Sequence, residues 1–422
     1  MIKKFGKLES VQKYFYVFAI QIFSQGIGLA IFSLISSSLG SAGIGYYSFF
    51  SNNFLLLGAV GTLGFETTVL RFRKEYFSKK LYSFPLLKKI IPIIIIWSIV
   101  VSIFGICIVS LINLEIDNIP TKFFYYLLCL IIPLALYLLF VNFIRSDKVV
   151  TSEIFRQLLI PTTFVLLFYF TYNTRSFNLT NNTVFWILIT SYLIGLILVT
   201  SLILFSYKMK TNKKELYTKK QLIKISSPVL IFSACAKLTP LVSIYLIPIY
   251  LDLNSLGAFV LAKKIAALAS MPILVINRVS TERLSQFFWN KQFTNLKSLL
   301  KKTSFYMTIL SLSIGIGILI FYDFFEIFFD KNILEESFWA CLIILSSVLI
   351  RSMMGPKKEF SNQCGLQKNA AVFQVLIFII TIILNLILIR QIGILGAAIS
   401  IAVIAVFEHL YFSYIVKNQL IN

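Results

Sequence analysis

The stretch Ile90–Ile112 has the sequence IIPIIIIWSIVVSIFGICIVSLI and carries no charged side chain. A helix needs ~20 predominantly apolar residues to cross the hydrocarbon core of a membrane. Because no water reaches backbone amides inside a bilayer, a spanning segment must be a helix or belong to a closed barrel. A run of this length without alternation of polar and apolar residues excludes the barrel, so the stretch predicts a transmembrane helix.

Comparable apolar runs occupy most of the chain. Its 422 residues are 58% hydrophobic and 13% charged, whereas soluble domains are roughly 45–50% apolar. This composition excludes a soluble enzyme and predicts an all-α, polytopic membrane protein with about 12 transmembrane helices. The predicted spans are Tyr14–Leu39, Ile44–Phe65, Ile90–Ile112, Phe123–Phe143, Ile154–Tyr172, Val184–Tyr207, Ile225–Tyr250, Leu256–Ile276, Phe305–Phe328, Phe338–Met354, Val372–Ile389 and Ile394–Val416.

The positive charges indicate which connections lie inside the cell. With a cytoplasmic N-terminus, most of the 39 lysines and arginines fall in connections on the inner side. The positive-inside rule therefore predicts that both termini are cytoplasmic. The net charge of +22 is explained by this topology, and we predict no nucleic-acid partner. The outer connections carry four cations, which are Lys122, Arg175, Lys331 and Arg390.

The basic stretch Lys208–Lys224 separates six predicted spans from six. It predicts an N-terminal lobe over residues 1–210 and a C-terminal lobe over residues 211–422. A shift of 212 residues places Gly45 on Gly257, each at the start of the second span of its half. Because each half has an even number of spans, the repeats would be parallel, as in transporters with a substrate site between two lobes. The same shift pairs Glu66 with Arg278, Arg71 with Arg283, Gln25 with Lys237, Gln21 with Ser233 and Asn52 with Lys264.

Three stretches carry a family resemblance. Ser38–Arg71 contains SLGSAGIGYYS and GTLGFE, Leu256–Ile265 is LGAFVLAKKI, and Asn385–Ile399 is NLILIRQIGILGAAI, preceded by GLQK at Gly365–Lys368. They resemble a glycine-bearing loop, an eighth-helix pattern and an Asn…Gly-x-x-Gly-Ala-Ala signature of the multidrug/oligosaccharidyl-lipid/polysaccharide (MOP) exporter superfamily. Within it, they are similar to the Wzx-type flippases of O-antigen and capsule repeat units.

The resemblance implies two six-helix lobes around a V-shaped cavity that opens alternately to either side of the bacterial inner membrane. The implied cargo is an undecaprenyl-diphosphate-linked oligosaccharide, with its head group inside the cavity. Some relatives carry an arginine in the first helix, where this chain has Gln21 and Gln25. The N-terminal lobe is therefore expected to contribute hydrogen bonds more than charge.

Ionisable residues inside predicted spans are candidates for binding this cargo, because a charge there costs ~2.5–3.5 kcal/mol and needs a partner or a wet cavity. Lys237 is the deepest, about 20 Å of helix beyond Lys224, and Pro240 predicts a broken, cavity-lining helix beside it. The alternatives are an internal salt bridge for Lys237 and an interfacial anchor for the other lysines. The predicted substrate-binding residues are Lys237, Lys264, Lys263, Gln25, Gln21, Ser233 and Asn52.

A second set of residues is predicted to couple or gate transport. Glu408 and His409 lie in the inner half of the last span, where a carboxyl or imidazole group could exchange a proton. The alternative for this pair is a satisfied polar contact, and the alternative for Glu66 is a structural ion pair or helix cap near Arg71. The predicted coupling and gating residues are Glu408, His409, Glu66, Arg71 and Arg278.

The five cysteines show no CxxC or Cys/His spacing, so no metal site is predicted. No phosphate-binding loop or hydrolase motif is present, and we expect neither enzymatic activity nor a cofactor. The leading function is a lipid-linked oligosaccharide flippase. The alternatives are a multidrug cation antiporter of the same superfamily and a membrane glycosyltransferase or polymerase. The expected partners are the lipid-linked cargo, membrane lipids, a polysaccharide polymerase and a coupling proton or sodium ion.

Overall fold

The computed structural model describes residues 2–78, 82–112, 121–145, 148–173, 180–206, 216–363 and 367–421. Every element in these ranges is helical. Nine of the helices are long and apolar enough to cross a membrane, and two bent helix pairs bring the number within the described ranges to 11. The predicted all-α, polytopic fold is therefore confirmed.

The first helix accounts for the remaining predicted span. The apolar part of α1 (Ile2–Gly61) runs over 46 residues from Tyr16 to Gly61, which is about 69 Å of helix and enough for two membrane crossings. Its helical backbone is interrupted at Gly40, where φ is 67° and ψ is −164°. A positive φ is readily adopted only by glycine, so this residue marks the boundary between the two crossings.

The packing of the helices divides the chain into two compact units. Unit 1 comprises Met1–Phe18, Phe32–Tyr46 and Thr239–Asn422, and unit 2 comprises Ala19–Ile31 and Tyr47–Leu238. Segments of α1 thus belong to both units. The division of the sequence at residue 210 stays a prediction about the repeat, and Lys237 lies in unit 2 by packing.

Unit 2 is built around α5, which packs against α2, α3, α6 and α8. Aromatic rings fill the space between α1, α4 and α8: Phe185 lies 4.9 Å from Phe50 and 4.8 Å from Phe123 between ring centroids, in edge-on geometry. Such pairs stabilise a core beyond their buried area. The helices of unit 2 besides α1 are α2 (Phe65–Ser78), α3 (Phe84–Ile112), α4 (Thr121–Cys129), α5 (Ile131–Arg145), α6 (Val149–Glu153), α7 (Ile160–Asn173), α8 (Asn181–Ser206) and α9 (Lys219–Leu238), with a π-helical turn at Ile154–Leu159.

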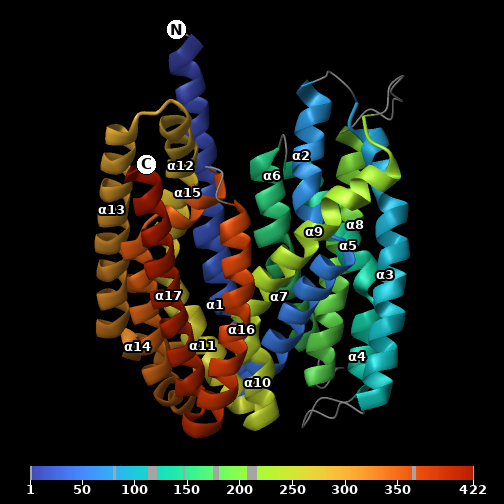
Figure 1. Cartoon of the computed structure of the whole chain (residues 1–422). Coiled ribbons are helices and arrows are strands. Elements are labelled where there is room, and N and C mark those ends of the chain that lie inside the picture. The colour runs from blue at the N-terminus through green and yellow to red at the C-terminus, as the bar shows by residue number, and fades with distance from the viewer. Residues whose placement is uncertain are drawn as a thin grey trace. The chain divides into compact units, whose positions relative to one another are not determined.

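Unit 1 is built around α14, which packs against α11, α13 and α17, while α16 packs against α10 and α17 (Figure 1). Small residues of α14, including Ser337, Ala340 and Ser347, are buried. Small side chains let membrane helices approach closely. The helices of unit 1 besides α1 are α10 (Val242–Tyr250), α11 (Leu253–Leu268), α12 (Met271–Trp289), α13 (Phe293–Ile320), α14 (Lys331–Met354), α15 (Lys357–Gln363), α16 (Gln367–Ile392) and α17 (Ile394–Ile421), with 3₁₀ turns at Thr239–Leu241 and Tyr322–Ile327.

Several predicted boundaries were wrong. The span expected at Phe305–Phe328 is α13, which begins at Phe293 and ends at Ile320. Its first turns are lysine-rich, and lysine is a good helix former, so the helix extends beyond the apolar run. The span expected at Leu256–Ile276 is two helices bent by 52°, and the one expected at Phe123–Phe143 is two helices bent by 42°.

Candidate functional site

The turn between α1 and α2 brings α2 onto α9 within unit 2. Gly64 has a φ of +77°, and a Cβ atom at this position would lie 2.5 Å from the carbonyl oxygen of Ser226. Glycine is required here both for its backbone conformation and for this close approach. One turn further along α2, the Oγ1 of Thr68 lies 2.7 Å from the Oγ of Ser226. The glycine-rich motif GTLGFE therefore fixes where the first turn of α2 meets α9.

Glu66 and Lys237 form an ion pair at this contact. Glu66 lies in the first turn of α2 and Lys237 in the last turn of α9. Each charge has the sign that the adjacent helix terminus favours. The Nζ of Lys237 donates a hydrogen bond to the Oε1 of Glu66, whose side chain is 7% exposed, whereas that of Lys237 is 37% exposed. The internal salt bridge considered for Lys237 is thus present, and its partner is the acid expected near Arg71.

The helix break expected at Pro240 lies in unit 1, where its polar groups have partners. The Nζ of Lys263 donates to the carbonyl oxygen of Pro240 at 2.9 Å. The Nε2 of Gln374 lies 3.3 Å from the Oγ1 of Thr239. A broken helix in a membrane needs such partners for the backbone groups that it frees. Lys263 therefore stabilises the 3₁₀ turn at Thr239–Leu241.

Lys264 differs from the adjacent Lys263 because it has no such hydrogen-bond partner among the described residues. It lies on α11, about 16 Å of helix beyond Leu253. Its side chain is partly buried, and among the described side chains no hydrogen-bond or carboxylate partner meets it. An ammonium group inside a membrane span is costly unless a partner or water stabilises it. Lys264 is therefore the predicted binding residue that has a positive charge available for an anion.

The remaining predicted binding residues lie in unit 2. The amide of Asn52 donates to the carbonyl of Ser48 at 2.7 Å, and the hydroxyl of Ser233 donates to the carbonyl of Leu230 at 3.1 Å, so both are satisfied within their own helices. Gln21 is buried. The Oε1 of Gln25 is also buried and has no hydrogen-bond partner within the described structure. Gln25 is therefore a buried acceptor that the described residues leave unsatisfied.

The predicted coupling residue Glu408 belongs to an ion network in unit 1. Its Oε1 lies 2.7 Å from the Nζ of Lys358 and its Oε2 lies 3.4 Å from the Nε of Arg351. The side chain of Glu408 is 8% exposed. His409 is partly buried, and its Nδ1 accepts no hydrogen bond from any described residue. Glu408 therefore forms ion pairs with two cations, whereas the Nδ1 of His409 has no partner among the described residues.

The side chains of Arg71 and Arg278 lie outside the described part of the structure. Their helices, α2 and α12, are described. Their predicted role in gating stays a prediction.

Sequence reasoning missed three features of these units. Arg73 is fully buried, with its guanidinium 4.0 Å from the ring centroid of Phe143. The sequence explained Arg351 and Lys358 only as cations that set the membrane topology, although both form ion pairs with Glu408. Asn385, part of the recognised signature, is fully buried and its Oδ1 accepts a hydrogen bond from Ser243 at 2.8 Å. Two signals were available for Asn385, which are its place in the family signature and its position in an apolar run. The two cations had none, because they follow the positive-inside pattern of their neighbours.

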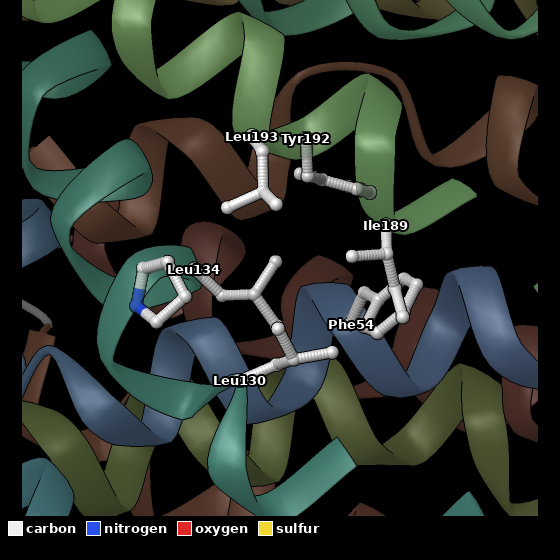
Figure 2. Close-up of a pocket in the computed structure, with 7 residues that line it drawn as sticks. Phe54, Leu130, Leu134, Ile189, Tyr192 and Leu193 are labelled. Atoms are coloured by element: carbon white, nitrogen blue, oxygen red, sulfur yellow. The ribbon is translucent and has the colours of Figure 1, made fainter. Parts of the chain in front are cut away.

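An apolar crevice in unit 2 is too small to hold cargo. Figure 2 shows Phe54 of α1, Leu134 of α5, and Ile189 and Leu193 of α8 facing one another around it. Its volume is about 10 Å³, which is close to the least that one water molecule needs. This crevice is part of the packed core.

Solved transporters share the fold of this chain. The lipid II flippase MurJ, in an inward closed conformation, superposes with a TM-score of 0.73 and 15% identity, over 96% of this chain and 88% of that one. An inward-facing multidrug resistance MATE family transporter of the MOP superfamily gives a TM-score of 0.70 and 12% identity, over 96% and 98% of the two chains. A MOP superfamily transporter from Pyrococcus furiosus gives 0.63 and 12%, over 96% and 94%. At these identities the likeness establishes the fold alone.

The family follows from the sequence. None of the curated proteins compared with the chain matches it. The family described as "Polysaccharide biosynthesis protein" matches residues 10–288, which is more than half of the chain. The protein is a multi-pass membrane protein with the MOP superfamily fold, and it belongs to the polysaccharide biosynthesis protein family.

Proposed function

We propose that the chain is a flippase that moves undecaprenyl-diphosphate-linked oligosaccharide repeat units across the bacterial inner membrane. The oligosaccharides would serve O-antigen, capsule or exopolysaccharide synthesis. The family match supports a role in polysaccharide biosynthesis. The fold supports alternating access, because transporters with this fold have been solved in inward-facing and outward-facing conformations.

The observation that carries the proposal is the cation of Lys264. It lies within a helix pair long and apolar enough to span a membrane, and it has no carboxylate partner among the side chains that the structure describes. A diphosphate supplies the missing anion, because charge-assisted hydrogen bonds from an ammonium group to phosphate oxygens are strong. Lys264 would therefore bind the diphosphate of the cargo during the crossing.

The side chain of Gln25 supports the proposal that the protein also binds the oligosaccharide of the cargo. Its buried Oε1 has no partner in the described structure, and an unsatisfied buried acceptor costs ~1–3 kcal/mol. The hydroxyl groups of an oligosaccharide are donors that can satisfy it. The departure of this chain from relatives with an arginine in the first helix is therefore consistent with an uncharged contact to the sugar.

The multidrug antiporter is less well supported. An organic cation would need a free acid inside a span. The two acids that the sequence suggested for this role, Glu66 and Glu408, both form ion pairs. Glu66 binds Lys237, and Glu408 binds Arg351 and Lys358. Both acids are already neutralised by residues of the chain.

The test in cells is to delete the gene and analyse the membrane lipids by mass spectrometry. A flippase predicts that complete lipid-linked repeat units accumulate, facing inward, while the surface polysaccharide disappears. A glycosyltransferase predicts that a truncated saccharide accumulates. An unchanged lipid pool would contradict the proposal and favour the drug antiporter.

A further inference from the structure

A basic pocket lies in unit 1, apart from the residues discussed above. Its volume is about 620 Å³. The helices that form the pocket meet at one end of the unit, where α13 begins and where α14 and α17 end. In Figure 1 this end is marked by the C-terminus and by the label of α15. The polar residues that line it are Lys297, Lys301 and Ser304 of α13, Lys357 of α15, and Ser413 and Lys417 of α17.

Among the side chains that the structure describes, no carboxylate forms an ion pair with any of the four lysines of this pocket. The Nζ of Lys357 donates to the Oγ of Ser413 at 2.9 Å. The adjacent Lys358 instead binds Glu408 at 2.7 Å. Two neighbouring lysines therefore serve different purposes, one in an ion network and one in the pocket.

The electrostatics of Lys357 agree with a pocket prepared for an anion. Partial burial lowers the pKa of Lys357 from its usual value, because desolvation disfavours the charged form. An anion bound beside the ammonium group would reverse this effect. The hydroxyls of Ser304 and Ser413 add donors for the oxygens of such an anion.

The rest of the pocket wall is apolar and continues into the surface of the span. Leu300 and Val416 are buried in the wall, and Met353 is 54% exposed. Beyond the pocket, α13 presents exposed apolar side chains at Phe305 and Ile309. Cations at the end of a span, followed by an apolar helix face, match the head group and acyl chains of a lipid.

We propose that this pocket binds the phosphate head group of an anionic membrane phospholipid in the leaflet that the sequence assigns to the cytoplasm. The positive-inside rule requires lysines near the inner ends of spans but does not require that they meet. Here four lysines from three helices converge on one cavity that has no acid in its lining. The site is independent of the proposed transport function, and its ligand is a resident lipid rather than the cargo.

The test uses the full-length protein purified in detergent. Its melting temperature is measured while phosphatidylglycerol, phosphatidylcholine or inorganic phosphate is added, and bound lipid is counted by native mass spectrometry. The pocket variant is Lys297→Gln/Lys301→Gln. The matched control is Lys220→Gln/Lys302→Gln, in which both lysines are exposed and lie outside the pocket. Lys302 follows Lys301 directly, so its side chain points about 100° away around the helix.

We expect phosphatidylglycerol, but neither phosphatidylcholine nor phosphate, to stabilise the wild type and the control variant. The pocket variant should bind phosphatidylglycerol about 30-fold more weakly, equivalent to about 2 kcal/mol for two lysines. Lys417→Gln should weaken binding in the same direction, which gives a second test if the double variant folds poorly. Equal binding by the pocket variants and the control would overturn the proposal. An equal response to inorganic phosphate would assign the pocket to a soluble phosphate compound, and would also overturn it.

Discussion

Gly45 of α1 and Gly257 of α11 contact each other's helices reciprocally. A Cβ atom at Gly45 would lie 2.2 Å from the carbonyl oxygen of Leu253, and one at Gly257 would lie 2.1 Å from the carbonyl oxygen of Ser41. In each case the oxygen belongs to the residue four positions before the other glycine. These are also the two glycines that the 212-residue shift places on each other. The close approach lies within unit 1, and the parallel repeat stays a prediction.

Alanine at either glycine should destabilise the protein. The added methyl group would meet a backbone oxygen that cannot move without its helix, so we expect Gly45→Ala and Gly257→Ala each to cost about 1–3 kcal/mol. Gly317→Ala is the matched control, because nothing lies within 4 Å of a Cβ atom there. Thermal unfolding in detergent measures the difference. A melting temperature for Gly257→Ala equal to that of Gly317→Ala would refute the close contact.

Lys264 should be needed for transport but not for folding. Lys264→Met removes a membrane-embedded charge without leaving a carboxylate unpaired, so we expect normal or higher thermal stability. We also expect surface polysaccharide to fall at least tenfold when the variant replaces the wild type in cells, and Lys264→Arg to restore part of it. Normal polysaccharide in cells that carry Lys264→Met would remove this residue from the mechanism.

The pair of Glu66 and Lys237 should show strong coupling. Lys237→Met leaves the buried carboxylate of Glu66 unpaired, and an unsatisfied buried polar group costs about 1–3 kcal/mol. The double variant Glu66→Gln/Lys237→Met removes both charges and should recover most of that loss. A double-mutant cycle of unfolding measures the coupling, and additive effects would show that the ion pair contributes nothing.

The same double variant separates two roles of Lys237. Loss of transport in Lys237→Ala alone could follow from the unpaired Glu66. We expect transport to recover together with stability in Glu66→Gln/Lys237→Met, because Glu66 already neutralises Lys237 and Lys264 keeps its charge for the cargo. Transport that stays impaired while stability recovers would instead assign a cargo-binding role to Lys237.

His409 and Glu408 should determine how transport depends on pH. His409 is the sole histidine of the chain, and an imidazole has an ordinary pKa near ~6.5. We expect His409→Asn to flatten the pH profile of transport. Glu408→Gln should also change that profile, because it leaves Arg351 and Lys358 without their shared acid. Unchanged profiles in both variants would end the proposal that this pair couples transport to protons.

Hydropathy alone was enough to predict the fold class. Runs such as Ile90–Ile112 have no alternative to a membrane helix, and α3 covers this run completely. Helix ends were harder to predict. Apolar content ends at the membrane boundary, whereas α13 continues into the lysine-rich segment before Phe305. The bend after Leu268 lies just before Pro272, a helix-interrupting residue that the predicted span Leu256–Ile276 ran across.

The site was only partly predictable, because pairing depends on contacts between distant segments. Lys237 and Glu66 were both identified as unusual, but only the packing of α2 on α9 shows that they neutralise each other. Lys263 and Lys264 are adjacent and chemically identical, and only the position of the Pro240 carbonyl separates their roles. The pairing of Arg351 and Lys358 with Glu408 was hidden because topology alone explained those cations.

The most direct test of the proposed flippase activity uses purified protein in liposomes. An undecaprenyl-diphosphate oligosaccharide is placed in one leaflet, and its appearance in the other is measured with a sugar-modifying enzyme that cannot cross the membrane. We predict that wild-type protein moves the lipid at least tenfold faster than Lys264→Met or empty liposomes do. Equal rates for the wild type and empty liposomes, with folded protein present, would contradict the account.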